Sequence, residues 1–145
     1  MNDSARRSWQ AKMIAPSCDQ GVSKQSSFVE GTVDYDGSDT LMLHISAQGL
    51  YRAFINGQRV GDDQLTPGWT CYDERIAYQS YDVTSLVRQG NNTVQIWLGD
   101  GWFRTALMWR DLLTTNTWGD RIAAIAEFEV GGKVVSKTDI TWKSG

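Results

Sequence analysis

The stretch Gly49-Leu-Tyr-Arg-Ala-Phe-Ile-Asn-Gly-Gln-Arg-Val-Gly61 decides the fold of this chain. It places an Asn56-Gly57 pair between two arms that favour extended backbone. A two-residue type I′ turn needs positive φ at both central positions, and Asn-Gly is the strongest short signal for it. The stretch therefore predicts a β-hairpin with its tip at Asn56-Gly57.

Strand-like patterning continues on both sides of the hairpin. Apolar and polar residues alternate with the two-residue period of half-buried strands. The residues expected to face the core on this basis are Leu41, Leu43, Ile45, Ala47, Val94, Ile96, Leu98, Ile122, Ala124, Ala126, Phe128 and Val130. Further strands are expected at residues 76–83, at 133–137 after a Gly131-Gly132 turn, and around Ile140 and Trp142.

Helical signals are almost absent. Asp82-Val-Thr-Ser-Leu-Val-Arg88 is compatible with one turn, with Asp82 or Thr84 as N-cap and Gly90 ending it. Many short antiparallel strands joined by Gly-rich turns predict an all-β protein, a jelly-roll β-sandwich with at most one short helical turn.

The beginning of the chain has weaker periodicity than the rest. Residues 1–35 are expected to form an N-terminal arm with one or two strands near Trp9–Ile14 and Ser27–Val33. The β-sandwich module is expected to cover residues 36–145.

Length and charge exclude several classes of protein. The 145 residues fit one domain, and the net charge of −3 comes from 14 basic and 17 acidic residues without long runs of either sign. Nucleic-acid binding would need a basic patch, and a membrane span would need about 20 apolar residues in a row. Residues 1–7 lack the apolar region of a secretory signal. We expect no nucleic-acid or membrane partner, and a cytoplasmic location or, if a signal was removed, an extracytoplasmic one.

Catalytic motifs are missing from the sequence. It has no Gly-x-Ser-x-Gly, no phosphate-binding loop and no Gly-x-Gly-x-x-Gly between a strand and a helix. With Cys18, Cys71 and a single histidine, His44, a structural zinc site is not expected. His44 lies on the polar face of its strand, where a solvated or hydrogen-bonded role is expected. The acidic residues that a glycoside-hydrolysing pair would draw on are Asp62, Asp63, Asp73, Glu74, Asp100, Asp111 and Asp120. All but Asp100 lie in ordinary polar turns, and no catalytic residue is expected.

The segment Leu98-Gly-Asp-Gly-Trp-Phe-Arg104 is the most distinctive part of the chain. Glycine permits a tight turn, so the tip can present a carboxylate beside a flat ring. Such pairs suit sugars, whose C–H faces stack on rings while their hydroxyls need polar partners. The alternative is a turn whose Trp102 and Phe103 cap the core. The chain has seven tryptophans, four of them between residues 97 and 118, which indicates either a hydrophobic wall or a recognition surface.

Several segments together resemble the N-terminal β-sandwich module of bacterial α-L-rhamnosidases. The resemblance runs in order from Gly49 to Trp142. The segments that carry it are Gly49–Asp62, Leu65-Thr-Pro-Gly-Trp-Thr70, Tyr72-Asp-Glu-Arg75, Tyr78-Gln-Ser-Tyr-Asp-Val-Thr84, Leu98–Arg104, Trp118-Gly-Asp-Arg121 and Thr138-Asp-Ile-Thr-Trp-Lys143.

The resemblance implies an accessory module of a larger enzyme. Members of this family are multidomain glycoside hydrolases that release terminal α-L-rhamnose with inversion, with catalytic acids on a separate (α/α) barrel. The chain is therefore expected to be non-catalytic alone, with that barrel and rhamnose-containing glycans as partners. In some relatives the equivalent module binds rhamnose with the help of calcium, and in others it supports the barrel. Family modules continue past the Trp-Lys segment, so an unpaired strand edge is expected near Gly145.

The resemblance and the residues together define a candidate sugar site without a required cofactor. Its members are Asp100 and Arg104 as hydrogen-bonding groups, Trp102 and Trp109 as stacking faces, and then Trp69 and Asp73. If calcium binds, Asp100 with nearby loop carbonyls is the expected ligand set.

Alternatives stay open for these residues. Trp69 is equally suited to pin the Pro67-Gly68-Trp69 loop against the sheet. Arg104 is equally suited to pair with Asp100 or Asp111 as a surface ion pair worth under about 1 kcal/mol.

Two other functions compete with sugar binding. A purely structural module would pack a Trp-rich face on the barrel and expose an apolar patch, whereas a binding module would show a shallow pocket with convergent polar groups beside exposed rings. A galactose-binding-like domain of another hydrolase would share the Asn-Gly hairpin and the Asp-Val-Thr turn, but not Leu-Gly-Asp-Gly-Trp.

Overall fold

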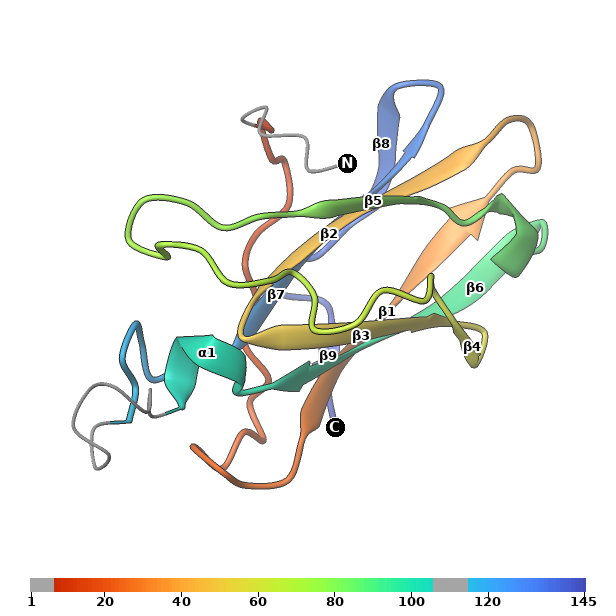
Figure 1. Cartoon of the computed structure of the whole chain (residues 1–145). Coiled ribbons are helices and arrows are strands. Elements are labelled where there is room, and N and C mark those ends of the chain that lie inside the picture. The colour runs from red at the N-terminus through yellow and green to blue at the C-terminus, as the bar shows by residue number, and fades with distance from the viewer. Residues whose placement is uncertain (1–6, 106–114) are drawn as a thin grey trace.

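Two antiparallel sheets pack face to face in the computed structural model, which describes residues 7–105 and 115–145 (Figure 1). One sheet has five strands in the order β4-β3-β6-β1-β9, and the other has four in the order β5-β2-β7-β8. The strands are β1 (Ser27–Tyr35), β2 (Leu41–Gln48), β3 (Leu50–Ile55), β4 (Gln58–Arg59), β5 (Gln79–Asp82), β6 (Gly90–Gly99), β7 (Ala123–Val130), β8 (Lys133–Lys137) and β9 (Lys143–Ser144). The predicted all-β jelly-roll sandwich is confirmed.

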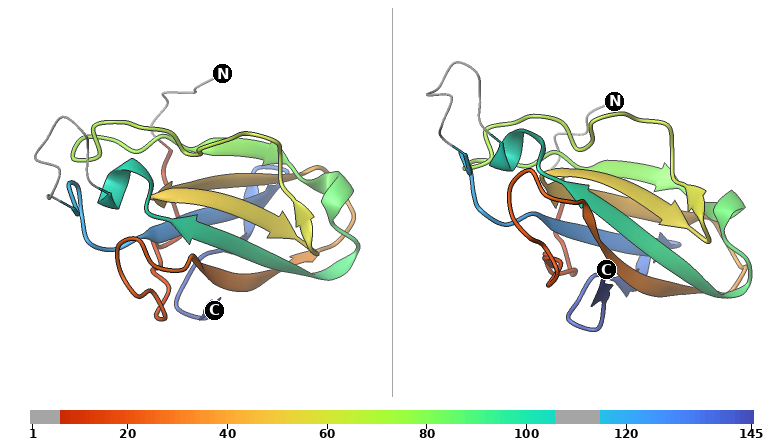
Figure 2. Two further views of the ribbon diagram at one scale, coloured as in Figure 1. Left: turned by 60° about the horizontal axis from the view of Figure 1, so that its bottom comes forward. Right: turned by 90° about the horizontal axis from the view of Figure 1, so that it is seen from below.

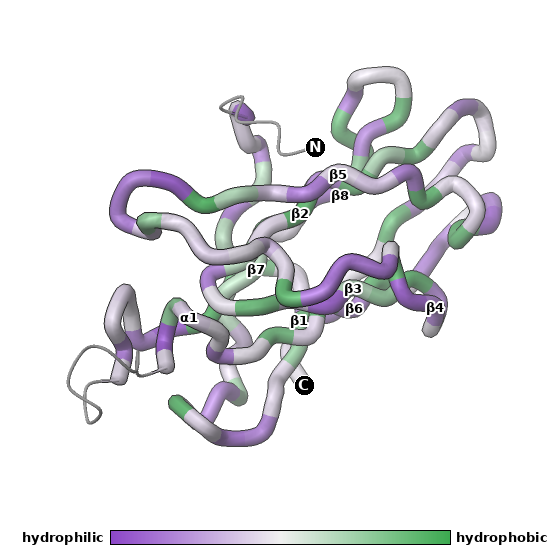
Figure 3. The backbone as a smooth tube through the Cα atoms, in the orientation of Figure 1, coloured by the Kyte–Doolittle hydropathy of each residue, from purple (hydrophilic) through white to green (hydrophobic). Residues whose placement is uncertain are grey.

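The core lies between the two layers, which Figure 2 shows from two further directions. Eleven of the twelve side chains predicted to face inward are buried, and Val130 packs against them partly buried. Each fully buried Val, Leu, Ile or Phe side chain contributes about 1.5–3 kcal/mol through removal of apolar surface from water. In Figure 3 apolar positions recur along the strands while the turns are mostly polar, which is the pattern that the alternation predicts.

The predicted hairpin is present at Asn56-Gly57. These two residues have φ values of 50° and 79°, and they join β3 to the two-residue strand β4. The Asn56 side chain also donates to the Asn92 Oδ1 at 2.8 Å, which ties the turn to β6.

The helical parts differ from the prediction. A 3₁₀ turn, η1 (Thr84–Leu86), forms where one turn was expected, but its N-cap is Val83, and Gly90 begins β6 instead of ending the turn. A second turn, α1 (Gly101–Arg104), follows β6. Gly101 has a φ of +52°, and a Cβ there would lie 2.6 Å from the Leu50 Cγ, so only glycine permits this entry into α1. No helix within residues 7–105 and 115–145 is long and apolar enough to cross a membrane.

The last strand is shorter than expected. β9 contains only Lys143 and Ser144, whereas Ile140 is 90% exposed. Asp139 accepts a hydrogen bond from the Thr141 amide at 2.8 Å, so the chain turns at this point instead of extending. Trp142 then packs its ring over Gly31, where a Cβ would lie 2.3 Å from the indole.

The segment before residue 36 contributes directly to the sandwich. β1 pairs with β6 along its whole length and with β9 on its other side, so the five-stranded sheet includes residues 27–35. Residues 9–14 form no regular strand, and only Ile14 makes an isolated bridge, to Ala124.

The N-terminal segment covers the outer face of the four-stranded sheet. Glu127 points outward from β7 and is nevertheless fully buried, because Arg7 donates to its Oε2 at 2.8 Å and the amide of Ala11 donates to its Oε1 at 2.7 Å. Next to it, His44 forms hydrogen bonds to Glu129 at 2.8 Å and Ser80 at 2.7 Å. The expectation that His44 is hydrogen-bonded is confirmed.

Candidate functional site

The predicted site lies at one end of the sandwich, which we call the α1 end. It consists of α1 and the loops of residues 16–24, 66–75 and 115–121 (Figure 1). Asp100, Trp102 and Arg104 reach it together because β6 ends at Gly99 and α1 follows at once. Asp73 is exposed in the 66–75 loop, and Trp109 lies outside the described residues.

Arg104 is buried at the centre of the α1 end, with 2% of its surface exposed. Its Nε donates to the Asp100 Oδ1 at 2.7 Å, and its Nη2 lies 2.6 Å from the same oxygen. Nη2 also donates to the Asp19 Oδ1 at 3.0 Å, and Nη1 pairs with the other Asp19 oxygen. Nη1 also donates to the Asp120 carbonyl at 3.2 Å, so the guanidinium joins α1 to the segments around residues 19 and 120.

The charges in this group stabilise one another. The hydrogen bond to Asp19 is the largest influence raising the pKa of Arg104, and hydrogen bonding from Arg104 lowers the pKa of Asp19. The Asp100 Oδ2 accepts from the Ser23 amide at 2.7 Å, so both oxygens of this carboxylate are engaged. Arg104 does pair with Asp100, but in a buried network and not in the surface ion pair that the sequence left open as an alternative. Asp111, the other partner considered, lies outside the described residues.

The surroundings of Asp100 do not fit a calcium ion in this arrangement. Calcium takes six to eight oxygen ligands, whereas the cation between Asp19 and Asp100 is already the Arg104 guanidinium. Within residues 7–105 and 115–145, no group of three or more His, Cys, Asp or Glu side chains is placed to hold a metal ion.

Aromatic rings from three segments meet around α1. Trp69 stacks on Trp102 with ring centroids 6.4 Å apart and an interplanar angle of 14°. Tyr72 meets Phe103 at 5.2 Å and Trp118 at 5.7 Å, both edge-on. We call these five residues the aromatic cluster. Trp69 is the most exposed residue of the aromatic cluster, with 48% of its surface accessible to solvent.

The sequence identified part of this arrangement and missed part of it. The Leu98–Arg104 segment indicated Trp102, whereas the density of tryptophans between residues 97 and 118 left the role of Trp118 open. Asp19 and Tyr72 were not predicted as partners, since each reaches α1 only through the tertiary fold. Asp19 in particular lies in a segment without periodicity.

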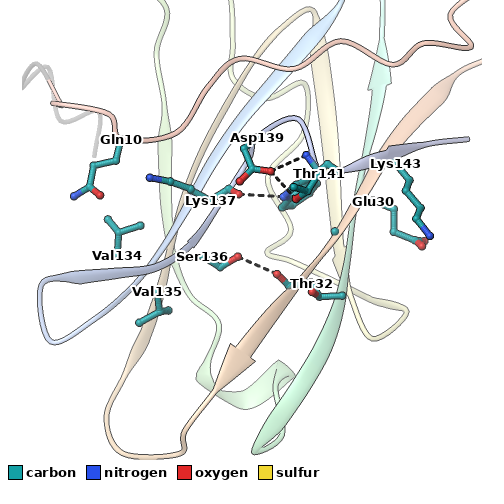
Figure 4. A pocket seen from close by; sticks show the side chains of 12 residues that line it. Gln10, Glu30, Thr32, Val134, Val135, Ser136, Lys137, Asp139, Thr141 and Lys143 are labelled. Carbon is teal, nitrogen blue, oxygen red and sulfur yellow. Dashed lines mark hydrogen bonds between the residues drawn. The ribbon is translucent and has the colours of Figure 1, made fainter.

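A hollow of about 550 Å³ opens between β1 and β8 (Figure 4). Some of its polar groups are paired with one another. Ser136 donates to the Thr32 carbonyl at 2.9 Å, and the Trp142 indole donates to the Lys137 carbonyl at 3.0 Å. The Ser136–Thr32 bond links β8 of one sheet to β1 of the other. We therefore interpret the hollow as a structural gap between the two sheets and not as a ligand site.

The fold places the chain among β-sandwich domains of much longer enzymes. The structure of an α-L-rhamnosidase from Aspergillus terreus matches 94% of this chain with a TM-score of 0.82 and 34% identity. An α-L-rhamnosidase from Streptomyces avermitilis, solved in complex with L-rhamnose, matches 83% of the chain with a TM-score of 0.73 and 32% identity. The chain covers only 16% and 12% of these two proteins.

The sequence comparisons give the family. The family model described as the alpha-L-rhamnosidase N-terminal domain matches residues 38–145. A curated α-L-rhamnosidase from Streptomyces avermitilis is 44% identical over 88 residues, which are 61% of this chain and 8% of that protein. The chain belongs to the α-L-rhamnosidase N-terminal domain family, and the resemblance seen in its motifs is confirmed.

Proposed function

We propose that this chain is a non-catalytic N-terminal module of an α-L-rhamnosidase-like glycoside hydrolase and that it supports the catalytic part of its parent enzyme through the aromatic cluster. The observation that carries this proposal is the stacked pair Trp69–Trp102, whose outer ring is 48% exposed at the tip of the sandwich. Trp69 is exposed and Tyr72, Trp102 and Trp118 beside it are half-buried, so this end offers aromatic surface that a protein partner can cover.

The polar groups at the α1 end favour support over sugar recognition. A sugar site needs polar side chains that converge on the ligand. Here Arg104 is buried and both oxygens of Asp100 are engaged within the chain. These side chains hold the loops in place, and the rings are what the α1 end offers to a partner.

Binding of L-rhamnose at the aromatic cluster is the second candidate function. Trp69, 48% exposed, offers aromatic surface of the kind that packs on the C–H face of a sugar, and one similar rhamnosidase was solved in complex with L-rhamnose. Asp73, exposed in the same loop as Trp69, is the acidic group available to such a ligand.

A titration of the 145-residue chain separates the two functions. Tryptophan fluorescence and calorimetric heat are followed as L-rhamnose is added to millimolar concentration, with calcium and then with chelator. A supporting module predicts no saturable change. It also predicts concentration-dependent self-association in sedimentation velocity that Trp69→Ser reduces. Ile140→Ser, which removes an exposed apolar side chain outside the cluster, is the matched control. Saturable rhamnose binding that Trp69→Ala abolishes would instead establish the second candidate.

The absence of catalysis is tested separately. Incubation of the chain with p-nitrophenyl α-L-rhamnopyranoside is expected to release no p-nitrophenol above the rate in buffer. Release that scales with protein concentration and survives repurification would contradict the non-catalytic assignment.

A further inference from the structure

The outer face of the five-stranded sheet carries a hollow of about 550 Å³, which we call the β3–β6 hollow. It lies on the side of β3 and β6 that faces outward from the core, and its lining extends to Gly99 at the end of β6. The residues that matter for its chemistry are Leu50, Arg52, Phe54, Gln64, Gln95 and Trp97.

Strand register builds the floor of the hollow. Trp97 on β6 lies directly opposite Arg52 on β3 and Phe28 on β1. Ile96 and Leu98 point into the core, so Trp97 between them must point outward. Its ring packs on Phe28 at 4.7 Å with an interplanar angle of 40°, which fixes its orientation on the sheet.

Hydrogen-bonding groups surround this floor. Arg52 is exposed, and the only hydrogen bond of its guanidinium within the described part of the chain is a long one of 3.4 Å to the Gln64 Oε1. A guanidinium has five N–H donors, so most of them are available to a ligand. Gln95 is held in place by its 2.6 Å hydrogen bond to Glu30.

The rim of the hollow carries a strained apolar residue. Leu65 has a φ of 55° and 59% of its surface is exposed. A bulky non-glycine residue at positive φ costs free energy, and such residues concentrate at ligand sites.

We propose that the β3–β6 hollow binds a glycan, with one pyranose ring stacked on Trp97 and polar groups of the neighbouring sugar bound by Arg52 and Gln64. A sugar presents an apolar C–H face and a ring of hydroxyls, and this hollow offers a ring floor with amide and guanidinium groups at its edge. The site is separate from the aromatic cluster and does not depend on the function proposed for it.

Affinity electrophoresis of the 145-residue chain tests this site. The gels contain rhamnogalacturonan I, gum arabic or gellan, which are polysaccharides containing L-rhamnose, chosen because the family is that of α-L-rhamnosidases. We expect at least one polysaccharide to retard the protein. Trp97→Ala and Arg52→Ala are each expected to weaken the interaction about tenfold, which corresponds to about 1.4 kcal/mol.

Two controls keep the result specific. Arg88→Ala removes an exposed positive charge outside the hollow, and Ile140→Ala removes an exposed apolar side chain outside it; both should leave the retardation unchanged. Arg52→Ala changes an exposed side chain, so it answers the question even if Trp97→Ala fails to fold.

Three results would overturn the proposal. The first is no retardation by any of the three polysaccharides, and the second is retardation that Trp69→Ala abolishes while Arg52→Ala has no effect. The third is a dimer in sedimentation velocity that Arg52→Ala dissociates, since that would assign the hollow to a second copy of the chain.

Discussion

Two arginines, Arg104 at the α1 end and Arg52 on the outer sheet face, occupy opposite kinds of environment. Arg104 is 2% exposed and bound by the carboxylates of Asp19 and Asp100, whereas Arg52 is exposed and makes one long hydrogen bond to Gln64. The arginine in the conspicuous Gly-Asp-Gly-Trp-Phe-Arg segment holds the fold together. The arginine within an ordinary strand is the one available to a ligand.

The physical reason lies in the cost of burying charge. A buried guanidinium must be paired and hydrogen-bonded, because leaving it unpaired costs several kcal/mol. At the α1 end the carboxylates of Asp19 and Asp100 pair with the Arg104 guanidinium and so are not available to a ligand. On the sheet face water supplies the partners, so the donors of Arg52 can exchange water for ligand.

Arg104→Ala is expected to have the largest effect on the free energy of unfolding. Removing the cation leaves the carboxylates of Asp19 and Asp100 close together without the positive charge between them, which should cost about 3–5 kcal/mol. Urea unfolding at neutral pH measures it, with Arg88→Ala as the exposed control. A loss below about 1 kcal/mol would show that the buried network contributes little and would break the contrast between the two arginines.

Asp19→Asn should have the next largest effect, and one that depends on pH. At neutral pH the loss of a charge-assisted hydrogen bond to Arg104 is expected to cost about 1–3 kcal/mol. The folded-state pKa of Asp19 lies below its ordinary value of 3.8, so its stabilisation is present above that value and is lost as pH falls through the folded pKa.

The difference in urea midpoint between the original chain and Asp19→Asn should therefore be constant from pH 7 to about pH 5 and shrink below about pH 4. Several other carboxyl groups also have lowered pKa values, but they are common to both proteins and cancel in the difference: Asp36, Asp82, Glu129 and Asp139. A difference that stays constant down to pH 2 would argue against an ionised Asp19 as the partner of Arg104.

Trp69→Ala is expected to lower stability only moderately. The ring is 48% exposed and its stacking on Trp102 is worth about 0.5–1.5 kcal/mol beyond buried area. Thermal unfolding followed by circular dichroism provides the measurement. A cost above about 3 kcal/mol would make Trp69 a core residue and remove it from the surface that the α1 end offers.

Arg52→Ala should change stability least, by no more than about 0.5 kcal/mol, because exposed residues without strong partners rarely contribute more. Chemical unfolding of this variant beside Arg104→Ala sharpens the comparison directly. An equal loss in both variants would mean that exposure does not distinguish the two arginines.

The sequence predicts those features of the structure that depend on residues close together in the chain, and it misses those that depend on residues far apart. The hairpin at Asn56-Gly57 and the alternation of Leu41 to Ala47 are local patterns, and both are confirmed. The turn α1 was not predicted as helix, because four residues are too few to show a helical period. The strand expected around Ile140 and Trp142 is replaced by a turn at Asp139, since a side-chain hydrogen bond competes there with extension.

The candidate site shows the same division. Asp100, Trp102 and Arg104 were identified from a short motif, and they do lie together. Their sugar-binding role stays a prediction. The pairing with Asp19 and the stacking with Trp69 join residues far apart in the chain, so no local pattern encodes them.

The sequence by itself determined the all-β sandwich, its hairpin, its core positions and its membership of the rhamnosidase family, because these depend on two-residue periodicity and on short motifs in order. Only the tertiary structure decided which polar groups are hydrogen-bonded within the fold and which remain available to a ligand. That outcome depends on which distant segments cover each side chain: the loop of Asp19 buries Arg104, while nothing in the described chain covers the donors of Arg52 in the same way.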